Sequence, residues 1–470
     1  MSIKAHKLGH WLPQDHHMTR QWLDNLIKHV DDHGKDLKHE LQEFKELIEG
    51  DITLKILAAL MFIEVPEKAP YNRDPLLEPQ VRDYHHMLKL LNHIMDSAPQ
   101  WSKIADDVGL IGFPINAILD WPMCTSSGNA FFLRPDVNEQ WTKILSKWAV
   151  YLGAPGSKSV LTDKENGWLS STALKELAIK GNNGVTDYTF DQLYVCNKNV
   201  EHYGFKSWDD FFIREFQADK RPLGEELFAP PAEQGEKPGL PIGGTPNIPK
   251  GAFIYNACES TPVFLRRHEA VHEKAKFWLK GQPYSLGDML DNDPFTPLFV
   301  HGTVYQAFLS ALSYHRWHSP VSGTIVRAFN VPGTYYSANY FEGFANPADK
   351  GGPDEVAPNN SQAYLTQVAA RAVIFIEADS KDIGLMCFAA FGMCEVSSNQ
   401  ITVAEGQHVD AGEQLGMFHF GGSTHCLLFR KGVELIFAQE PTKGDSYDPP
   451  PEHNTPLRAA IAVVNEPNKK

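Results

Sequence analysis

The Gly-Gly-Ser-Thr step at residues 421–424 is the stretch of this sequence best suited to do chemistry on itself. Two glycines leave the backbone before Ser423 uncrowded, so the serine hydroxyl can approach the carbonyl of Gly422. That attack would convert the amide into an ester, and elimination with hydrolysis would leave a pyruvoyl ketone that can bind an amine as a Schiff base. The same residues also fit a tight turn or a phosphate-binding loop. The step therefore needs an activating base elsewhere in the chain.

The segment YHRWHSP at 314–320 offers that base, because it places His315 and His318 three residues apart. Histidine suits proton transfer because its ordinary pKa lies near neutrality. The alternative is a metal pair, which would need a third protein ligand. The candidates for that ligand are His301, His419 and His425. Their spacing matches no known metal motif, so we expect no metal site.

Composition limits the classes of function that the chain can have. The 470 residues suggest about two or three domains, and 42% hydrophobic with 21% charged residues is typical of a globular protein. A net charge of -15 argues against a nucleic-acid partner and against binding to an anionic membrane. The six cysteines form no C-x-x-C pair. The polar N-terminus and a longest apolar run of only 56–65 predict a cytoplasmic protein without a membrane anchor.

Apolar residues at helical spacing predict a helical N-terminal domain over residues 1–165. The stripes are Leu37, Leu41, Phe44 and Ile48; Tyr84, Leu88, Leu91 and Met95; and Trp141, Leu145, Trp148 and Leu152. Each stripe is expected to be packing surface. Three prolines in 112–138 predict that this stretch loops out of the helical region.

The remainder of the chain divides into a connecting segment, 166–250, and a strand-rich domain, 251–470. Ser207 is the expected N-cap of a short aromatic helix, and the Pro/Gly-rich stretch 220–250 is expected to be a linker or a surface excursion. Beyond residue 251 we expect strands at 299–305 and 324–331, and a hairpin of 373–378 with 384–391. Residues 342–362 read as a long polar loop. The fold class is therefore α+β.

Two half-motifs, 319–326 and 403–418, place glycines between short strands as in lipoyl/biotinyl-like barrels. A carrier domain is thus one alternative function. A carrier needs a lysine at the hairpin tip, whereas this chain has His408-Val409-Asp410. The carrier interpretation fails at that position.

The motifs taken together resemble the phosphatidylserine decarboxylase family of pyruvoyl enzymes. In order, they are Phe211-Phe212 with Arg214, Arg221-Pro222, Lys280-Gly281 with Tyr284-Ser285-Leu286, YHRWHSP-VSGTI, and the final GGST. The resemblance covers about residues 200 to 440. The helical half is similar to the extension of a soluble branch that includes fungal L-tryptophan decarboxylases. The fold it implies is a β-rich decarboxylase domain, with the barrel elements above, behind a helical N-terminal domain.

The resemblance implies a proenzyme that cuts itself between Gly422 and Ser423, leaving a large chain 1–422 and a small chain 423–470. Ser423 would become the covalent pyruvoyl cofactor, and no metal would be required. His318 corresponds to the histidine of the self-cleavage triad, and His315 to the histidine assigned to decarboxylation. The family's acid is usually an aspartate in Pro-Ala-Asp-Gly, and the equivalent stretch 257–260 is Ala-Cys-Glu-Ser.

That departure makes Glu259 the expected acid of the triad. A glutamate can orient a histidine as an aspartate does, but from one methylene further away. Asp293 is the alternative acid, and a plain surface carboxylate is the alternative interpretation of Glu259.

The expected reaction releases carbon dioxide from a free aromatic L-amino acid, with tryptophan giving tryptamine, because no anchor or basic amphipathic helix is evident. Phe418, Phe420 and Trp317 flank the reactive groups and could stack on an aromatic ring, although such residues are more often core. The expected partners are the small-molecule substrate and the enzyme's own small chain. The alternatives are a phosphatidylserine decarboxylase that makes phosphatidylethanolamine, and a non-catalytic binding protein on the same scaffold.

Overall fold

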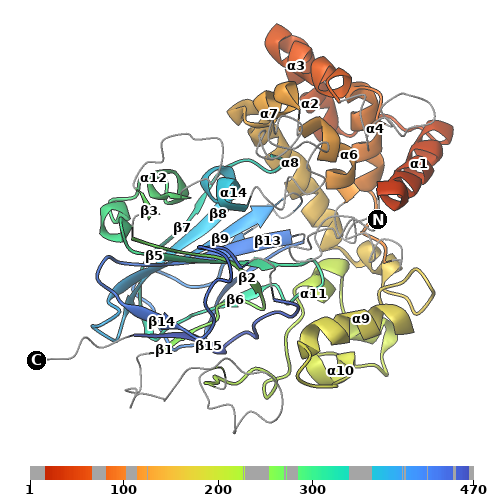
Figure 1. Ribbon diagram of the computed structural model, residues 1–470. Helices are drawn as coiled ribbons and strands as arrows, with labels where there is room; N and C mark the ends of the chain where they lie inside the picture. The colour runs from red at the N-terminus through yellow and green to blue at the C-terminus, as the bar shows by residue number, and fades with distance from the viewer. Residues whose placement is uncertain are drawn as a thin grey trace, which may run out of the picture.

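A computed structural model describes most of the chain (Figure 1). The described residues are 16–65, 81–101, 114–123, 125–225, 227, 253–268, 271–272, 284–337, 362–393, 395, 399–420, 422–447 and 451–464. The helices α1 to α8 gather at one end of the molecule, and the strands form the other end (Figure 1). No described helix is long and apolar enough to cross a membrane.

Helices dominate the first half of the chain, as the apolar stripes predict. Their bounds are α1 His16–Asp32, α2 His39–Gly50, α3 Ile52–Ile63, α4 Tyr84–Ile94, α6 Pro114–Met123, α7 Ser126–Phe132, α8 Pro135–Leu152, α9 Ser171–Asn182, α10 Phe190–Leu193 and α11 Trp208–Phe212. The stripes on α2, α4 and α8 are buried in a common core. Ser207 caps α11 as predicted, since its hydroxyl accepts the backbone N–H of Asp210 at 3.0 Å.

The prediction of a loop over 112–138 is wrong, because this stretch forms α6, α7 and the start of α8. Pro114 and Pro135 stand at the first positions of their helices, where the missing N–H has no partner to lose. Thr125 caps α7 by accepting the N–H of Gly128 at 2.9 Å. Two of the three prolines therefore mark helix starts, whereas Pro122 lies inside α6, one residue before its end.

The second half of the chain builds a seven-stranded sheet in the order β11-β7-β8-β9-β13-β5-β2, antiparallel throughout. Smaller sheets have the orders β10-β12-β6, β1-β15-β14 and β3-β4. The strands are β1 Phe253–Tyr255, β2 Thr261–Arg267, β3 Val271–His272, β4 Tyr284–Ser285, β5 Thr303–Leu309, β6 Arg316–His318, β7 Gly323–Val331, β8 Arg371–Ala378, β9 Leu385–Met393, β10 Asn399–Ile401, β11 His408–Val409, β12 Gln414–Phe418, β13 Gly422–Phe429, β14 Leu435–Phe437 and β15 Ala460–Val464. Two short helices accompany them, α12 Leu286–Met289 and α14 Gln362–Val368.

The large sheet is buried on both faces. One face packs with the small sheets β10-β12-β6 and β1-β15-β14, and the other packs under α12 and α14 (Figure 1). Helix α8 packs against two segments that flank the sheet: the ring centroids of Trp141 and Tyr336 lie 4.6 Å apart, and those of Trp148 and Phe420 lie 5.0 Å apart. Because Phe420 directly precedes the GGST step, α8 covers the reactive end of the sheet.

The strand predictions are largely confirmed. The 373–378 and 384–391 hairpin is β8 with β9, and 324–331 is β7, but the strand expected at 299–305 begins only at Thr303 after a 3-10 turn, Thr296–Phe299. The two half-motifs pair through β11 and β7, and β12 of the second pairs with β6, which directly precedes the first. The described strands form no closed barrel, so the lipoyl-like barrel is not confirmed. The domain boundaries near 165 and 250 remain predictions, and Lys280-Gly281 and the loop 342–361 lie outside the described residues.

Candidate active site

Ser423 lies at the start of β13, a central strand of the large sheet. It pairs with Leu309 of β5 on one side and Gly392 of β9 on the other, and Gly422 pairs with Met393. The Ser423 side chain is fully buried, and its hydroxyl has no hydrogen-bond partner among the described residues. Buried hydroxyls are nearly always bonded. The open hydroxyl therefore fits a group held for reaction with its own backbone.

His315 lies close to the segment that leads into the GGST step. Its backbone carbonyl accepts the N–H of Phe418 at 2.9 Å, so it flanks the end of β12. Its fully buried ring stacks on Phe212 with 4.0 Å between centroids, and Phe212 in turn lies 5.6 Å from the ring of Phe420. His315 is thus linked by one aromatic ring to a residue three positions before Ser423.

His318 lies at the other end of β6, where its backbone N–H donates to the carbonyl of Ala257 at 2.9 Å. Nδ1 faces the Gly412 carbonyl at 2.9 Å and Nε2 faces the Tyr314 hydroxyl at 3.2 Å. The Gly412 carbonyl only accepts and the Arg458 guanidinium, whose Nη2 lies 3.2 Å from the same Nδ1, only donates, so these contacts are compatible with either tautomer of the ring. Burial, reinforced by the Arg458 guanidinium, lowers the pKa of His318 to about 3. The ring is therefore a neutral base at physiological pH.

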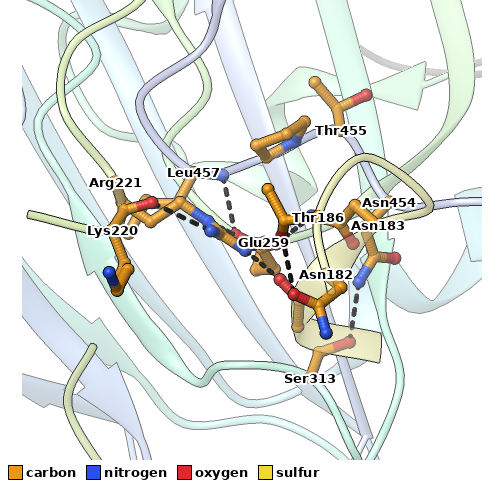
Figure 2. Close-up of polar contacts among 12 residues, drawn as sticks. Asn182, Asn183, Thr186, Lys220, Arg221, Glu259, Ser313, Asn454, Thr455 and Leu457 are labelled. Atoms are coloured by element: carbon orange, nitrogen blue, oxygen red, sulfur yellow. Dashed lines mark hydrogen bonds and ion pairs between the residues drawn. The ribbon is translucent and has the colours of Figure 1, made fainter. Parts of the chain in front are cut away.

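Glu259 is buried, so its interpretation as a surface carboxylate is wrong. Figure 2 shows its carboxylate facing Arg221, Asn183 and the backbone of Leu457. Arg221 donates Nε to Oε2 at 3.0 Å and Nη2 to Oε1 at 2.8 Å, and the Leu457 N–H donates to Oε2 at 2.8 Å. Both oxygens are thus occupied by groups other than His318.

Glu259 reaches His318 through Arg458. Arg458 follows Leu457 in the chain, donates Nη1 to the Arg221 carbonyl at 3.0 Å and Nε to the Gly412 carbonyl at 2.8 Å, and places Nη2 3.2 Å from His318 Nδ1. The same Gly412 carbonyl faces the histidine. The Glu259 carboxylate therefore positions residues that contact His318. A direct contact between a triad acid and His318 stays a prediction.

Glu259→Gln should slow self-cleavage and lower the free energy of unfolding by about 3 kcal/mol or more, because it leaves the buried Arg221 without a counter-charge. Chemical denaturation and the fraction cut over time measure the two effects. The matched control is Glu413→Gln, an exposed glutamate whose side chain accepts the N–H of Asp410 at 3.0 Å. A glutamine oxygen can accept the same hydrogen bond, so this variant should change neither quantity. Normal cleavage in Glu259→Gln would move the expected acid to Asp293.

Asp293 has a separate setting in the structure. Its carboxylate pairs with Arg327 at 2.9 Å and accepts the N–H of Phe295 at 2.9 Å, on the face of the sheet near α12. None of the hydrogen bonds described for the His318 ring involves Asp293, so Asp293 stays the weaker alternative. Among the described residues, no group of three or more histidine, cysteine or acidic side chains is placed to hold a metal ion.

The three aromatic residues predicted to bind substrate lie in two different places. Trp317 and Phe418 are fully buried in the core between the sheets, 5.6 Å apart, with Trp317 stacked on Phe388. Phe420 instead lines a cavity of about 350 Å³ together with Trp148 of α8.

Glu395 is a cavity residue that the sequence interpretation missed. Its Oε1 accepts the N–H groups of Ile115 and Asn116 in the first turn of α6, at 2.7 and 2.8 Å, while Oε2 has no partner among the described residues. Burial raises the pKa of Glu395 to about 8, against the opposing effect of the two backbone hydrogen bonds. No motif surrounds Glu395 in the sequence, and only the fold brings it to residues 115 and 420.

His425 is a second residue whose setting the sequence did not reveal. It follows Ser423 by two residues in β13, so the two side chains lie on the same face of the strand. The centroid of its imidazole ring lies 5.9 Å from that of Phe388 and 6.2 Å from that of Tyr305. Both of those residues lie opposite Leu427, so the imidazole leans away from Ser423. Burial lowers the pKa of His425 to about 3, which makes it a neutral core residue.

Comparison with known proteins matches both halves of the chain to one family. Residues 38–177 and residues 249–447 match two family models, each described as phosphatidylserine decarboxylase. The first covers the helices and the second covers the strands up to and beyond the GGST step.

Individual relatives are similar over most of the chain. The L-tryptophan decarboxylase of Psilocybe cubensis is 36% identical over 412 residues, which are 87% of this chain and 84% of the relative. Decarboxylase iboD of Amanita muscaria is 38% identical over 364 residues, 76% of this chain and 96% of the relative. Phosphatidylserine decarboxylase proenzyme 3 of Schizosaccharomyces pombe is 26% identical over 230 residues, 49% of this chain and 19% of the relative.

Proposed function

This chain belongs to the phosphatidylserine decarboxylase family of carboxy-lyases, and we propose that it matures by cutting itself between Gly422 and Ser423 and then decarboxylates an aromatic L-amino acid. The observation that carries the proposal is the buried hydroxyl of Ser423 at the start of a central strand, which has no hydrogen-bond partner among the described residues. The pyruvoyl group made from Ser423 would supply the ketone that takes the substrate amine and the carbonyl that withdraws electrons as carbon dioxide leaves.

The two histidines of the YHRWHSP segment divide the proton transfers in this proposal. We assign removal of the proton from the Ser423 hydroxyl to His318, because its buried ring is neutral at physiological pH and can therefore accept a proton. His315, on the Phe212 and Phe420 side, suits delivery of a proton to the substrate carbon after carbon dioxide has left. Phe212 orients the imidazole by stacking on it.

The cut chains are expected to stay together. The small chain 423–470 contributes nearly all of β13, which lies between β9 and β5 of the large chain, and β15, which pairs with β1. Leu457 and Arg458 of the small chain also bond to Glu259 and Arg221 of the large chain. Removing the small chain would take β13 out of the centre of the large sheet. The small chain is therefore expected to stay bound to the large chain permanently.

The aromatic substrate is supported by the cavity and by the relatives. The L-tryptophan decarboxylases match this chain along most of its length, whereas the phosphatidylserine decarboxylase proenzyme matches about half of it. The cavity volume of about 350 Å³ is within the usual range of small-molecule sites, about 300–1,000 Å³.

Purified protein should release carbon dioxide from L-tryptophan in buffer without lipid and without added pyridoxal phosphate. The measurement is amine formation from tryptophan, tyrosine, phenylalanine and, in parallel, from phosphatidylserine in mixed micelles. Turnover of phosphatidylserine with none of the three amino acids would contradict the proposed substrate and leave self-cleavage untouched. Turnover of none of the four would contradict the proposed function.

A further inference from the structure

Ser423 and His315 are closed off from solvent in the uncut chain, because both side chains are fully buried. The amine of a free amino acid must reach position 423 once the pyruvoyl group has formed, so part of the protein has to move before the enzyme can act. The proposed self-cleavage creates a free chain end at this place, since the large chain then ends at Gly422, two residues after Phe420. Phe420 is therefore the described side chain to consider first.

The Phe420 ring is enclosed by three other aromatic rings. Its centroid lies 4.6 Å from Trp208, 5.0 Å from Trp148 and 5.6 Å from Phe212, and each pair meets edge-on. Trp208 and Phe212 of α11 stack on each other at 5.2 Å, and Phe212 stacks on His315 at 4.0 Å. Edge-on and stacked contacts are the arrangements that aromatic pairs prefer. The space filled by Phe420 therefore suits a flat aromatic ring and lies one ring away from His315.

Phe420 also separates these buried residues from a cavity. It lines the cavity of about 350 Å³ together with Trp148 and Val150, and Val150 is 71% exposed, so the cavity borders solvent. Trp208 and Phe212 lie against Phe420 but do not line the cavity. Moving the Phe420 ring away would therefore join the cavity to the space beside Phe212 and admit a ring from solution.

His419 holds the chain directly before Phe420. Its Nδ1 lies 2.9 and 3.0 Å from the two carboxylate oxygens of Asp209 in α11, and its Nε2 lies 2.8 Å from Gln400 Oε1 in β10. These contacts do not involve the bond that is cut. After the cut, Phe420 is the third residue from a chain end, and chain ends are where order is most easily lost. Its ring can then leave the site by rotation of the backbone next to His419.

We propose that Phe420 occupies the aromatic site of the substrate in the uncut chain, and that self-cleavage releases it so that Trp148, Trp208 and Phe212 receive the substrate's ring. The inference rests on the proposed function and adds the residues that bind the substrate's side chain. A ring bound against Phe212 lies beside the stacking partner of His315, the residue assigned to protonation of the substrate carbon. Phe420 thus keeps the site closed until the chain has been cut.

The test places para-fluorophenylalanine at position 420 and compares its fluorine NMR resonance in the cut enzyme and in the uncut Ser423→Ala protein. The uncut protein should show a resonance displaced by the ring currents of Trp148 and Trp208, and the cut enzyme should show that of a solvent-exposed ring. The matched control carries the label at position 418, because Phe418 lies in the core beside Trp317 and should resonate alike in both forms. An unchanged resonance from position 420 in a cut, active enzyme would overturn the proposal and leave the proposed function standing.

Indole, which has the substrate's ring but no amine, gives a second measurement without any label. Calorimetry should show that the cut wild type binds indole and that Ser423→Ala binds it weaker by roughly 10-fold or more, because Phe420 fills the site in the uncut form. Equal affinities, or no binding by the cut enzyme, would overturn the proposal. A wild type that is never cut would overturn the proposed function as well.

Trp208→Leu tests the wall of the site. This variant should still be cut, and its KM for tryptophan should rise by roughly 10-fold while kcat changes little, because the bound ring loses one aromatic contact. A purely structural role of Trp208 would leave KM unchanged, and that result would overturn its assignment to the site.

Discussion

Ser423→Ala is expected to remain a single chain of full length with no measurable decarboxylase activity. Alanine has no hydroxyl to attack the Gly422 carbonyl, so neither the ester nor the pyruvoyl group can form. The fold should survive, because the Ser423 hydroxyl has no partner among the described residues and its loss breaks no described hydrogen bond. Denaturing electrophoresis, an amine assay and thermal unfolding measure the three outcomes.

The control for this variant is Ser157→Ala, which removes an equally buried hydroxyl far along the chain. Ser157 donates to the carbonyls of Leu152 and Ala154 at 2.7 Å, so its loss should cost about 1 kcal/mol or more of stability and yet leave cleavage intact. An active Ser423→Ala enzyme, cut or uncut, would rule out a pyruvoyl group at this position.

The second large effect is expected from substitutions of His318 and His315, which should impair two different steps. His318→Ala should cut itself slower by roughly 10²- to 10⁴-fold, because Ser423 loses the neutral imidazole that we propose as the base for its hydroxyl proton. Time courses of cleavage after rapid expression or refolding give the rate. His318→Gln, which keeps a similar bulk beside Tyr314, controls for the cavity left by alanine.

His315→Ala should be cut at close to the wild-type rate but should decarboxylate roughly 10²- to 10⁴-fold slower, because the proton donor on the Phe212 side is gone. His315→Phe restores the stacking partner of Phe212 without a proton, so it should be cut and remain equally slow. Normal cleavage and full activity in both alanine variants would show that the YHRWHSP segment has a structural role only.

The sequence predicted the parts of the fold that follow from local periodicity. The apolar stripes of α2, α4 and α8, the Ser207 cap and the β8-β9 hairpin are set by neighbouring residues, and the structure has them. The prolines were a misleading local signal, because proline disrupts the interior of a helix but is favoured at its first turn. Pro135, for example, begins α8.

The environment of the candidate site could be predicted less well, because it depends on contacts between distant residues. Glu259 meets Arg221, 38 positions away, and Leu457, 198 positions away. Glu395 bonds Ile115 across 280 positions. Trp317 and Phe418 looked equivalent to Phe420 by sequence, but only the fold shows that they are core and that Phe420 lines the cavity. No single-sequence pattern encodes such distant neighbours.

The most direct test of self-cleavage is the intact mass of the purified protein. The account predicts two chains, residues 1–422 and a small chain beginning at position 423 that is one ammonia lighter than the unmodified peptide and resists N-terminal sequencing, as a pyruvoyl end would. Reduction of the sample in the presence of tryptophan should attach the amine to the small chain alone. A single chain of 470 residues that releases carbon dioxide from amino acids would contradict the account.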